Sequence, residues 1–251
     1  MMVQPDPSVP FLTGSDPDRE AEAALTELRD SMAPNASMVT ETDLSVASAL
    51  YRVVRREGCD LLVVGSSRRA ADERVRIGGC TRQLLSRVNC GIAIAPRGMH
   101  RRRQGRLRKI GVGYNGRPES EAALTLAGSL AAAAGAELHV RAVVDDRVRT
   151  LVRSALGGLM ATEWTAVIMR EEARLRDLMA AATGAIDANV DFEVLRGHPS
   201  DVLLTLSHEV DLLVVGSRRW GPVARVVLGR TGEAVVHDAA CSVLALPRPA
   251  S

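Results

Sequence analysis

The sequence predicts an α/β protein made of two tandem domains with doubly wound parallel sheets, of which the first is incomplete. Three observations lead to this fold class. A segment near residue 60 recurs 151 residues later, apolar runs of strand length alternate with helical segments, and aromatic residues make up only 2% of the chain. Without aromatic bulk the core is built from Val, Leu, Ile and Ala, which suits buried parallel strands under Ala-rich helices.

An internal repeat organises the chain. The segment DLLVVGS at residues 60–66 recurs at residues 211–217. At the same offset the alignment places Gly78 on Gly229, Cys90 on Cys241, and Pro96-Arg97 on Pro247-Arg248. The alignment runs without a gap from residue 60 to 97. A register held over this length indicates a duplication.

Each copy has the same order of elements. The run LLVVG, at residues 61–65 and 212–216, predicts a strand buried on both faces. A polar, Arg-rich loop follows, and then a helix over residues 78–88 in the first copy and 231–239 in the second. A second apolar run, residues 91–95 and 242–246, predicts a strand that ends at a proline, where a ladder donor is no longer needed.

The second copy has further elements upstream. We expect strands at residues 109–114, 137–144 and 190–195. We expect a turn at Asn115-Gly116 and helices from Pro118 to Gly135, over 163–183, and from Pro199 to His208. Strands that alternate with helices in this way favour a parallel, doubly wound sheet.

The first copy is shorter. It predicts helices at residues 18–31 and 45–57 and a strand at 37–41, but nothing equivalent to the strand-helix-strand unit that begins at Lys109. Residues 1–6 look like the tail of such a unit, so we expect an upstream start codon or a truncated gene. The expected organisation is a truncated domain at 1–97, a basic linker at 98–108 and a complete domain at 109–251.

Composition excludes several classes of protein. A net charge of +2 implies no strong general attraction to nucleic acid, and the basic run at 100–109 lacks interleaved aromatic residues, which favours a solvated linker over a nucleic-acid patch. The four cysteines and five histidines show no zinc spacing and no catalytic spacing. With no apolar run of the ~18 residues that span a membrane and no signal-peptide pattern, we expect a cytoplasmic protein without membrane contact.

A phosphate-loop pattern occurs in the second copy. Gly216 follows a strand and Gly229 opens a helix, with an Arg-rich loop between them. In an open parallel sheet, ligands bind beyond the carboxyl ends of the strands, and a helix N-terminus favours anions. The alternative is that these glycines serve as turn residues and the arginines are solvated.

The two segments DLLVVGSRRWGPVARVVLGRTGEAVVHDAACSVLALPR and DLLVVGSSRRAADERVRIGGCTRQLLSRVNCGIAIAPR resemble the closing part of universal stress proteins, a Rossmann-like family. The segment IGVGYNGRPESEAALTLA is similar to the opening strand, loop and helix of that family. The arrangement resembles tandem members from high-GC bacteria, which fits a chain whose only lysine is Lys109.

The resemblance implies an ATP site with the motif Gly-x-x-Gly, nine residues, then Gly-Ser/Thr. Here Arg219 replaces the middle glycine and Arg230 the Ser/Thr, although Thr231 follows, while Asn115 stands for an acidic residue. The residues expected at the nucleotide are Gly113, Asn115, Val143, Gly216, Arg219, Gly229, Arg230 and Thr231. The first copy keeps Gly65 and Gly78 but lacks the strand that bears the adenosine-side residue, so a complete site is expected only in the second copy.

The leading functional hypothesis is a stress-response regulatory module that binds ATP or a related nucleotide and is not an enzyme. Two alternatives stay open: an interaction-only protein with a degenerate nucleotide site, and a slow ATPase. In this family the last strand often pairs across a two-fold axis. The strands near residues 92–95 and 243–246 are therefore expected to form a pseudo-dimer within one chain, with a homodimer as the other option.

Overall fold

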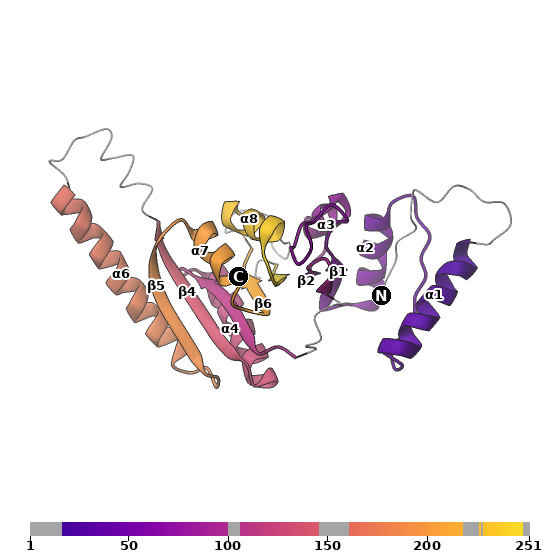
Figure 1. Ribbon diagram of the computed structural model, residues 1–251, viewed down its shortest axis with the longest axis horizontal. Coiled ribbons are helices and arrows are strands. Elements are labelled where there is room, and N and C mark those ends of the chain that lie inside the picture. The colour runs from indigo at the N-terminus through magenta and orange to yellow at the C-terminus, as the bar shows by residue number, and fades with distance from the viewer. Residues whose placement is uncertain (1–16, 100–105, 146–160, 218–225, 227, 248–251) are drawn as a thin grey trace. The chain divides into compact units, whose positions relative to one another are not determined.

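The computed structural model describes residues 17–99, 106–145, 161–217, 226 and 228–247. The chain divides into two units, Met1–Cys59 and Asp60–Ser251, which are described separately (Figure 1). The boundary lies just ahead of the first repeated strand.

The described part of the N-terminal unit contains the two expected helices, α1 (Pro17–Met32) and α2 (Val46–Glu57). The Ser45 side chain caps α2 by accepting a hydrogen bond from the N–H of Ser48. Gly58, with φ of 62°, ends the helix in the left-handed conformation that glycine adopts most easily.

The prediction of a strand at residues 37–41 was wrong, because the structure has no strand there. A strand needs a neighbour for its backbone hydrogen bonds, and the described part of this unit offers only helices. The segment is instead tied to α2 by Glu41, whose carboxylate lies 3.0 Å from Arg52 and 2.9 Å from Arg56.

The second unit holds one seven-stranded sheet with the order β1-β2-β7-β6-β3-β4-β5. Its strands are β1 (Leu61–Gly65), β2 (Gly91–Ala95), β3 (Lys109–Tyr114), β4 (Glu137–Asp145), β5 (Val190–Gly197), β6 (Leu212–Val215) and β7 (Ser242–Ala245). Every neighbouring pair is parallel except β2 and β7. The α/β fold expected from the sequence is confirmed, and its sheet is parallel apart from the β2–β7 pair.

Helices cover both faces of this sheet. They are α3 (Gly79–Leu85), α4 (Pro118–Ala134), α6 (Ala161–Thr183), α7 (Pro199–Leu206) and α8 (Arg230–Asp238). Ile110 and Val112 point into a core shared with α4 and α6. On the opposite face, Gly111 and Gly113 lie against Leu206 and Leu203 of α7, so close that a Cβ on Gly111 would lie 2.9 Å from a Leu206 methyl carbon.

The antiparallel pairing of β2 with β7 joins the two copies. Ile92 faces Ala245, Ala93 faces Leu244 and Ile94 faces Val243. The expected pairing of the two last strands within one chain is therefore confirmed. It makes β7 an interior strand and leaves β1 and β5 as the edges of the sheet.

The repeated LLVVG run is buried on both faces in only one copy. All four residues of β6 are buried, whereas Leu61 and Val63 of β1 are 48% and 58% exposed. The expectation for the first copy was wrong because β6 has β3 beside it and belongs to the core under α4, while β1 is an edge strand. Across the described ranges, no helix is both long and apolar enough to cross a membrane.

Candidate functional site

The second copy has a topological switch point between β3 and β6. From β3 the chain continues through β4 and β5 on one side of the sheet, and then returns to β6 and β7 on the other side. Connections that leave in opposite directions open a crevice at the carboxyl ends of the two central strands. A cavity of about 580 Å³ lies there, bordered by the ends of β3, β4 and β6 and the first turns of α4, α7 and α8.

Seven of the eight residues that the sequence assigns to a nucleotide line this cavity. They are Gly113, Asn115, Val143, Gly216, Gly229, Arg230 and Thr231. The eighth, Arg219, lies outside the described residues. The seven come from four separate parts of the sequence, and the folded chain places them around one cavity, as the sequence predicted.

The N-terminus of α8 faces the cavity. Gly229 is its N-cap, with extended backbone (φ −82°, ψ 178°) and no capping side chain, and Arg230 and Thr231 form the first helical positions. The first amides of a helix have no intrahelical acceptor, and the helix dipole places positive charge beside them. This end of the cavity is therefore suited to an anion such as phosphate.

Gly216 has a packing role that the sequence did not reveal. A Cβ at this position would lie 2.4 Å from the carbonyl oxygen of Glu119 in the first turn of α4. Its repeat equivalent, Gly65, has no atom within 4 Å of the same point. Close approach of the α4 backbone is by itself enough to require glycine at residue 216.

Asn115 shapes the opposite end of the cavity. Its Oδ1 accepts hydrogen bonds from the Arg117 N–H at 3.1 Å and from the Ser120 hydroxyl at 3.0 Å. Because a backbone N–H can only donate, Oδ1 must be the atom turned toward the loop, which leaves Nδ2 for a ligand. Gly116 completes the turn with φ of 71°, where a side chain would be strained and would also meet Leu178.

Val143 lies where β4 runs past the end of β3. Ala142 faces Tyr114, the last residue of β3, and β4 continues to Asp145 along the border of the cavity. Tyr114 itself is buried and donates a short hydrogen bond to Glu121. Burial, with that bond as the second cause, raises the pKa of Tyr114, so its hydroxyl stays protonated and structural.

Charged side chains of both signs line the cavity. The arginines are Arg117, Arg141, Arg174 and Arg230, and the acidic residues are Glu119, Asp145 and Glu171. Arg141 lies 2.7 Å from Asp191, and Arg174 lies 2.8 Å from Glu171. Neither Arg117 nor Arg230 has an ion-pair partner within the described part of the chain, so these two guanidinium groups are the ones left for an anionic ligand.

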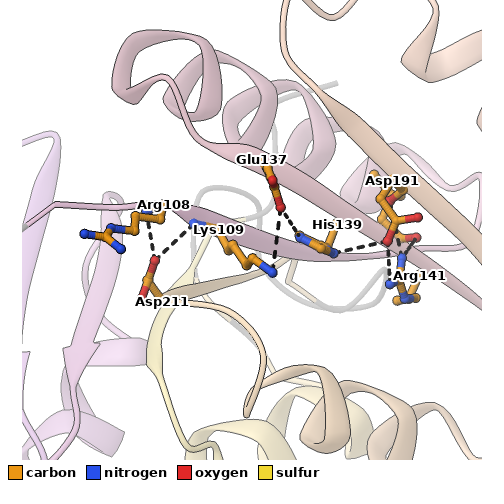
Figure 2. Close-up of polar contacts among 8 residues, drawn as sticks. Arg108, Lys109, Glu137, His139, Arg141, Asp191 and Asp211 are labelled. Carbon is orange, nitrogen blue, oxygen red and sulfur yellow. Dashed lines mark hydrogen bonds and ion pairs between the residues drawn. The ribbon is translucent and has the colours of Figure 1, made fainter. Parts of the chain in front are cut away.

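The contacts of Arg141 belong to a polar network that runs across β3, β4 and β5 (Figure 2). His139 lies between Asp191 at 3.1 Å and Glu137 at 3.4 Å, and Glu137 also lies 3.7 Å from Lys109. These contacts join neighbouring strands. In the ranges that the structure describes, no group of three or more His, Cys, Asp or Glu side chains is placed to hold a metal ion.

Sequence reasoning missed five arginine and glutamate residues at the cavity: Arg117, Glu119, Arg141, Glu171 and Arg174. Arg117 and Glu119 follow Asn115 closely, so the turn and helix predicted there could have pointed to them. Arg141 and Arg174 carry no such signal in the sequence. The side-chain direction along β4 brings Arg141 to the cavity, and the packing of α6 brings Arg174 there, only in the folded chain.

The strand order, the switch-point cavity and the uncapped helix facing it define an α/β protein of the Rossmann-like class. The model of the "Universal stress protein family" matches residues 2–96 and again 106–247. The chain belongs to the universal stress protein family, and the family match occurs in tandem.

Individual relatives agree with this assignment. The chain is 28% identical over 233 residues to a universal stress protein of Mycobacterium tuberculosis H37Rv and to one of Mycobacterium bovis, covering 91% of this chain and 77% of each relative. A solved universal stress protein structure from Archaeoglobus fulgidus has a TM-score of 0.66 at 22% identity, covering 92% of this chain and 79% of its own. A crystal structure of a "Putative Universal Stress Protein" from Pseudomonas aeruginosa UCBPP-PA14 has a TM-score of 0.64 at 16% identity, covering 90% of this chain and 77% of its own. At these identities the two structures support the fold.

Proposed function

We propose that the second copy binds ATP or a related nucleotide in the switch-point cavity, and that the protein is a cytoplasmic stress-response regulatory module rather than an enzyme. The observation that carries this proposal is the convergence of seven nucleotide-motif residues on one cavity. Its volume of about 580 Å³ falls within the range of small-molecule sites, roughly 300–1,000 Å³.

The proposed orientation follows from the two ends of the cavity. The phosphates lie at Gly229 and Thr231, where the amides of α8 and the guanidinium of Arg230 supply positive charge. The adenosine lies toward Asn115 and Val143. At that end Asn115 offers a hydrogen-bond donor through Nδ2, where an acidic residue would offer only acceptors.

A calorimetric titration of ATP into wild type and two matched variants tests the site. Gly229 and Gly78 are equivalent N-cap residues with extended backbones, so valine can adopt the backbone conformation at both positions without strain. We expect Gly229→Val to abolish binding, because its side chain blocks the approach of a phosphate to α8, and Gly78→Val to bind as wild type does. Equal binding by wild type and Gly229→Val contradicts the site.

Arg219→Gly tests the departure from the family motif. The substitution restores the glycine of the family motif, and we expect tighter ATP binding if the arginine side chain crowds a bound phosphate. Weaker binding would instead assign Arg219 a charge-assisted contact with the phosphates, worth roughly 1.5–3 kcal/mol. Absence of binding by every variant, Arg219→Gly included, would favour the interaction-only alternative.

Two further measurements separate the remaining alternatives. Mass spectrometry of the denatured, freshly purified protein identifies any nucleotide that copurifies. Incubation with ATP and magnesium, followed by detection of ADP, tests the slow-ATPase alternative; we expect no turnover above a Gly229→Val control.

A further inference from the structure

The loop of the first copy at residues 66–77, ahead of the N-cap of α3, contacts the far end of α8. The N–H of Val75, a fully buried residue, donates to the carbonyl of Ala239 at 2.8 Å. The N–H of Ile77 donates to the carbonyl of Val236 at 3.1 Å. The last carbonyls of a helix have no intrahelical donor, so these bonds satisfy and hold that end of α8.

Two arginines of the first copy strengthen the same contact. Arg74 donates to the carbonyl of Asp238 at 2.9 Å and lies 3.3 Å from Nε2 of His208. Arg82 of α3 lies 3.0 Å from Nε2 of His237. A guanidinium can only donate, so each imidazole accepts through Nε2. The positive charge of Arg74 also complements the negative end of the α8 dipole.

A return contact runs from the second copy to the first. Val226, only 2% exposed, is the repeat equivalent of Val75 and lies three residues ahead of Gly229. Its N–H donates to the carbonyl of Leu85, at the end of α3, at 3.2 Å. Each copy thus sends its loop to a helix of the other copy, and the segment leading into the nucleotide motif is anchored on the first copy.

These contacts give α8 two separate attachments. Its N-terminus borders the cavity and its C-terminus rests on the loop of the first copy. A helix of nine residues is about 13 Å long, and its backbone hydrogen bonds connect one end to the other. We propose that the first copy positions the nucleotide site of the second copy through α8, with Arg74 as the main positioning residue. This inference rests on the proposed function.

The test compares Arg74→Ala with Arg76→Ala. Arg76 is exposed, and its side chain has no hydrogen bond or ion pair within the described part of the chain, so the control removes the same charge without a contact to the second copy. We expect Arg74→Ala to weaken ATP binding by roughly 3- to 30-fold, Arg74→Lys to restore part of the affinity, and Arg76→Ala to bind like wild type. All titrations are run well below each variant's unfolding temperature.

A second readout uses the reciprocity of coupling. If the loop of the first copy affects nucleotide affinity, the nucleotide must affect the loop by the same free energy. We therefore expect ATP to slow hydrogen exchange at the amides of Val75 and Ile77 in wild type. Equal ATP affinity of Arg74→Ala and wild type, or unchanged exchange at these amides, overturns the inference and leaves the proposed function standing. If wild type binds no nucleotide, the proposed function fails and this inference fails with it.

Discussion

At the ends of β1 and β6, equivalent glycines of the repeat have different surroundings. A Cβ at Gly216 would meet the Glu119 carbonyl oxygen at 2.4 Å, whereas a Cβ at Gly65 would meet nothing within 4 Å. We expect Gly216→Ala to lower the free energy of unfolding by about 1–3 kcal/mol, because backbone has to move. We expect Gly65→Ala to leave the free energy of unfolding unchanged or to raise it by up to about 1 kcal/mol, because alanine reduces the conformational entropy of the unfolded chain. Urea unfolding of both variants measures the difference, and equal effects would contradict the packing role of Gly216.

The ion pair between Arg141 and Asp191 predicts a pH dependence. The hydrogen bond from Arg141 is the main cause that lowers the pKa of Asp191, and the charges of Arg141 and His139 add to it while burial opposes it. A carboxyl whose pKa is lower in the folded state stabilises that state above its unfolded pKa, and the contribution disappears as the pH falls through the folded value.

We therefore expect Asp191→Asn to destabilise the protein at pH 7 and to do so much less at a pH well below about 4, the ordinary pKa of an aspartate. Because Asp191 is more than half exposed, the effect at pH 7 should stay under about 1 kcal/mol. Urea unfolding at both pH values measures it. Asp177→Asn, at an exposed site on α6 without an ion pair among the described residues, is the control and should show no such dependence.

At the scale of elements, the β2–β7 pair is the junction that holds the two copies in one sheet. Leu244 is buried and lies between Ala93 of β2 and Val214 of β6. Proline removes a ladder donor in the interior of the sheet, where no water can replace it. We expect Leu244→Pro to cost about 3 kcal/mol or more, from lost packing together with an unpaired backbone group.

The matched variant Leu244→Ala keeps the backbone donor and loses only the packing, so it should be less destabilising than Leu244→Pro. Thermal unfolding and small-angle scattering of both variants separate the two contributions. Wild-type stability and shape in the proline variant would show that the β2–β7 ladder does not join the copies.

At the scale of the whole molecule, the shared sheet predicts that the two copies assemble without a covalent link. The β2–β7 ladder and the exchanged loops connect residues before 100 with residues after 105. We expect residues 1–99 and 106–251, coexpressed as separate chains with a tag on one of them, to copurify as a 1:1 complex. Leu244→Pro in the second chain should reduce the yield of complex. Recovery of the tagged chain alone would contradict this expectation.

The sequence by itself determined the fold class, the order of the elements in the second copy and the pairing of the last strands. The fold class and the order of the elements follow from local apolar periodicity and from a gapless repeat, both visible along the chain. The pairing of the last strands was expected from the resemblance to the family. The same information gathered seven of the eight proposed site residues, since a parallel sheet brings the carboxyl ends of its strands to one edge.

Only the tertiary structure decided what depends on neighbours distant in sequence. Residues 37–41 have strand-like sequence but no partner strand in their unit, and two identical LLVVG runs differ in burial because one has strands on both sides and the other is an edge. The place of Arg174 at the cavity and the hold of Arg74 on α8 likewise arise from packing between separate elements. A local pattern fixes which way a side chain can point, but burial, pairing and close approach are set by whatever the rest of the chain places beside it.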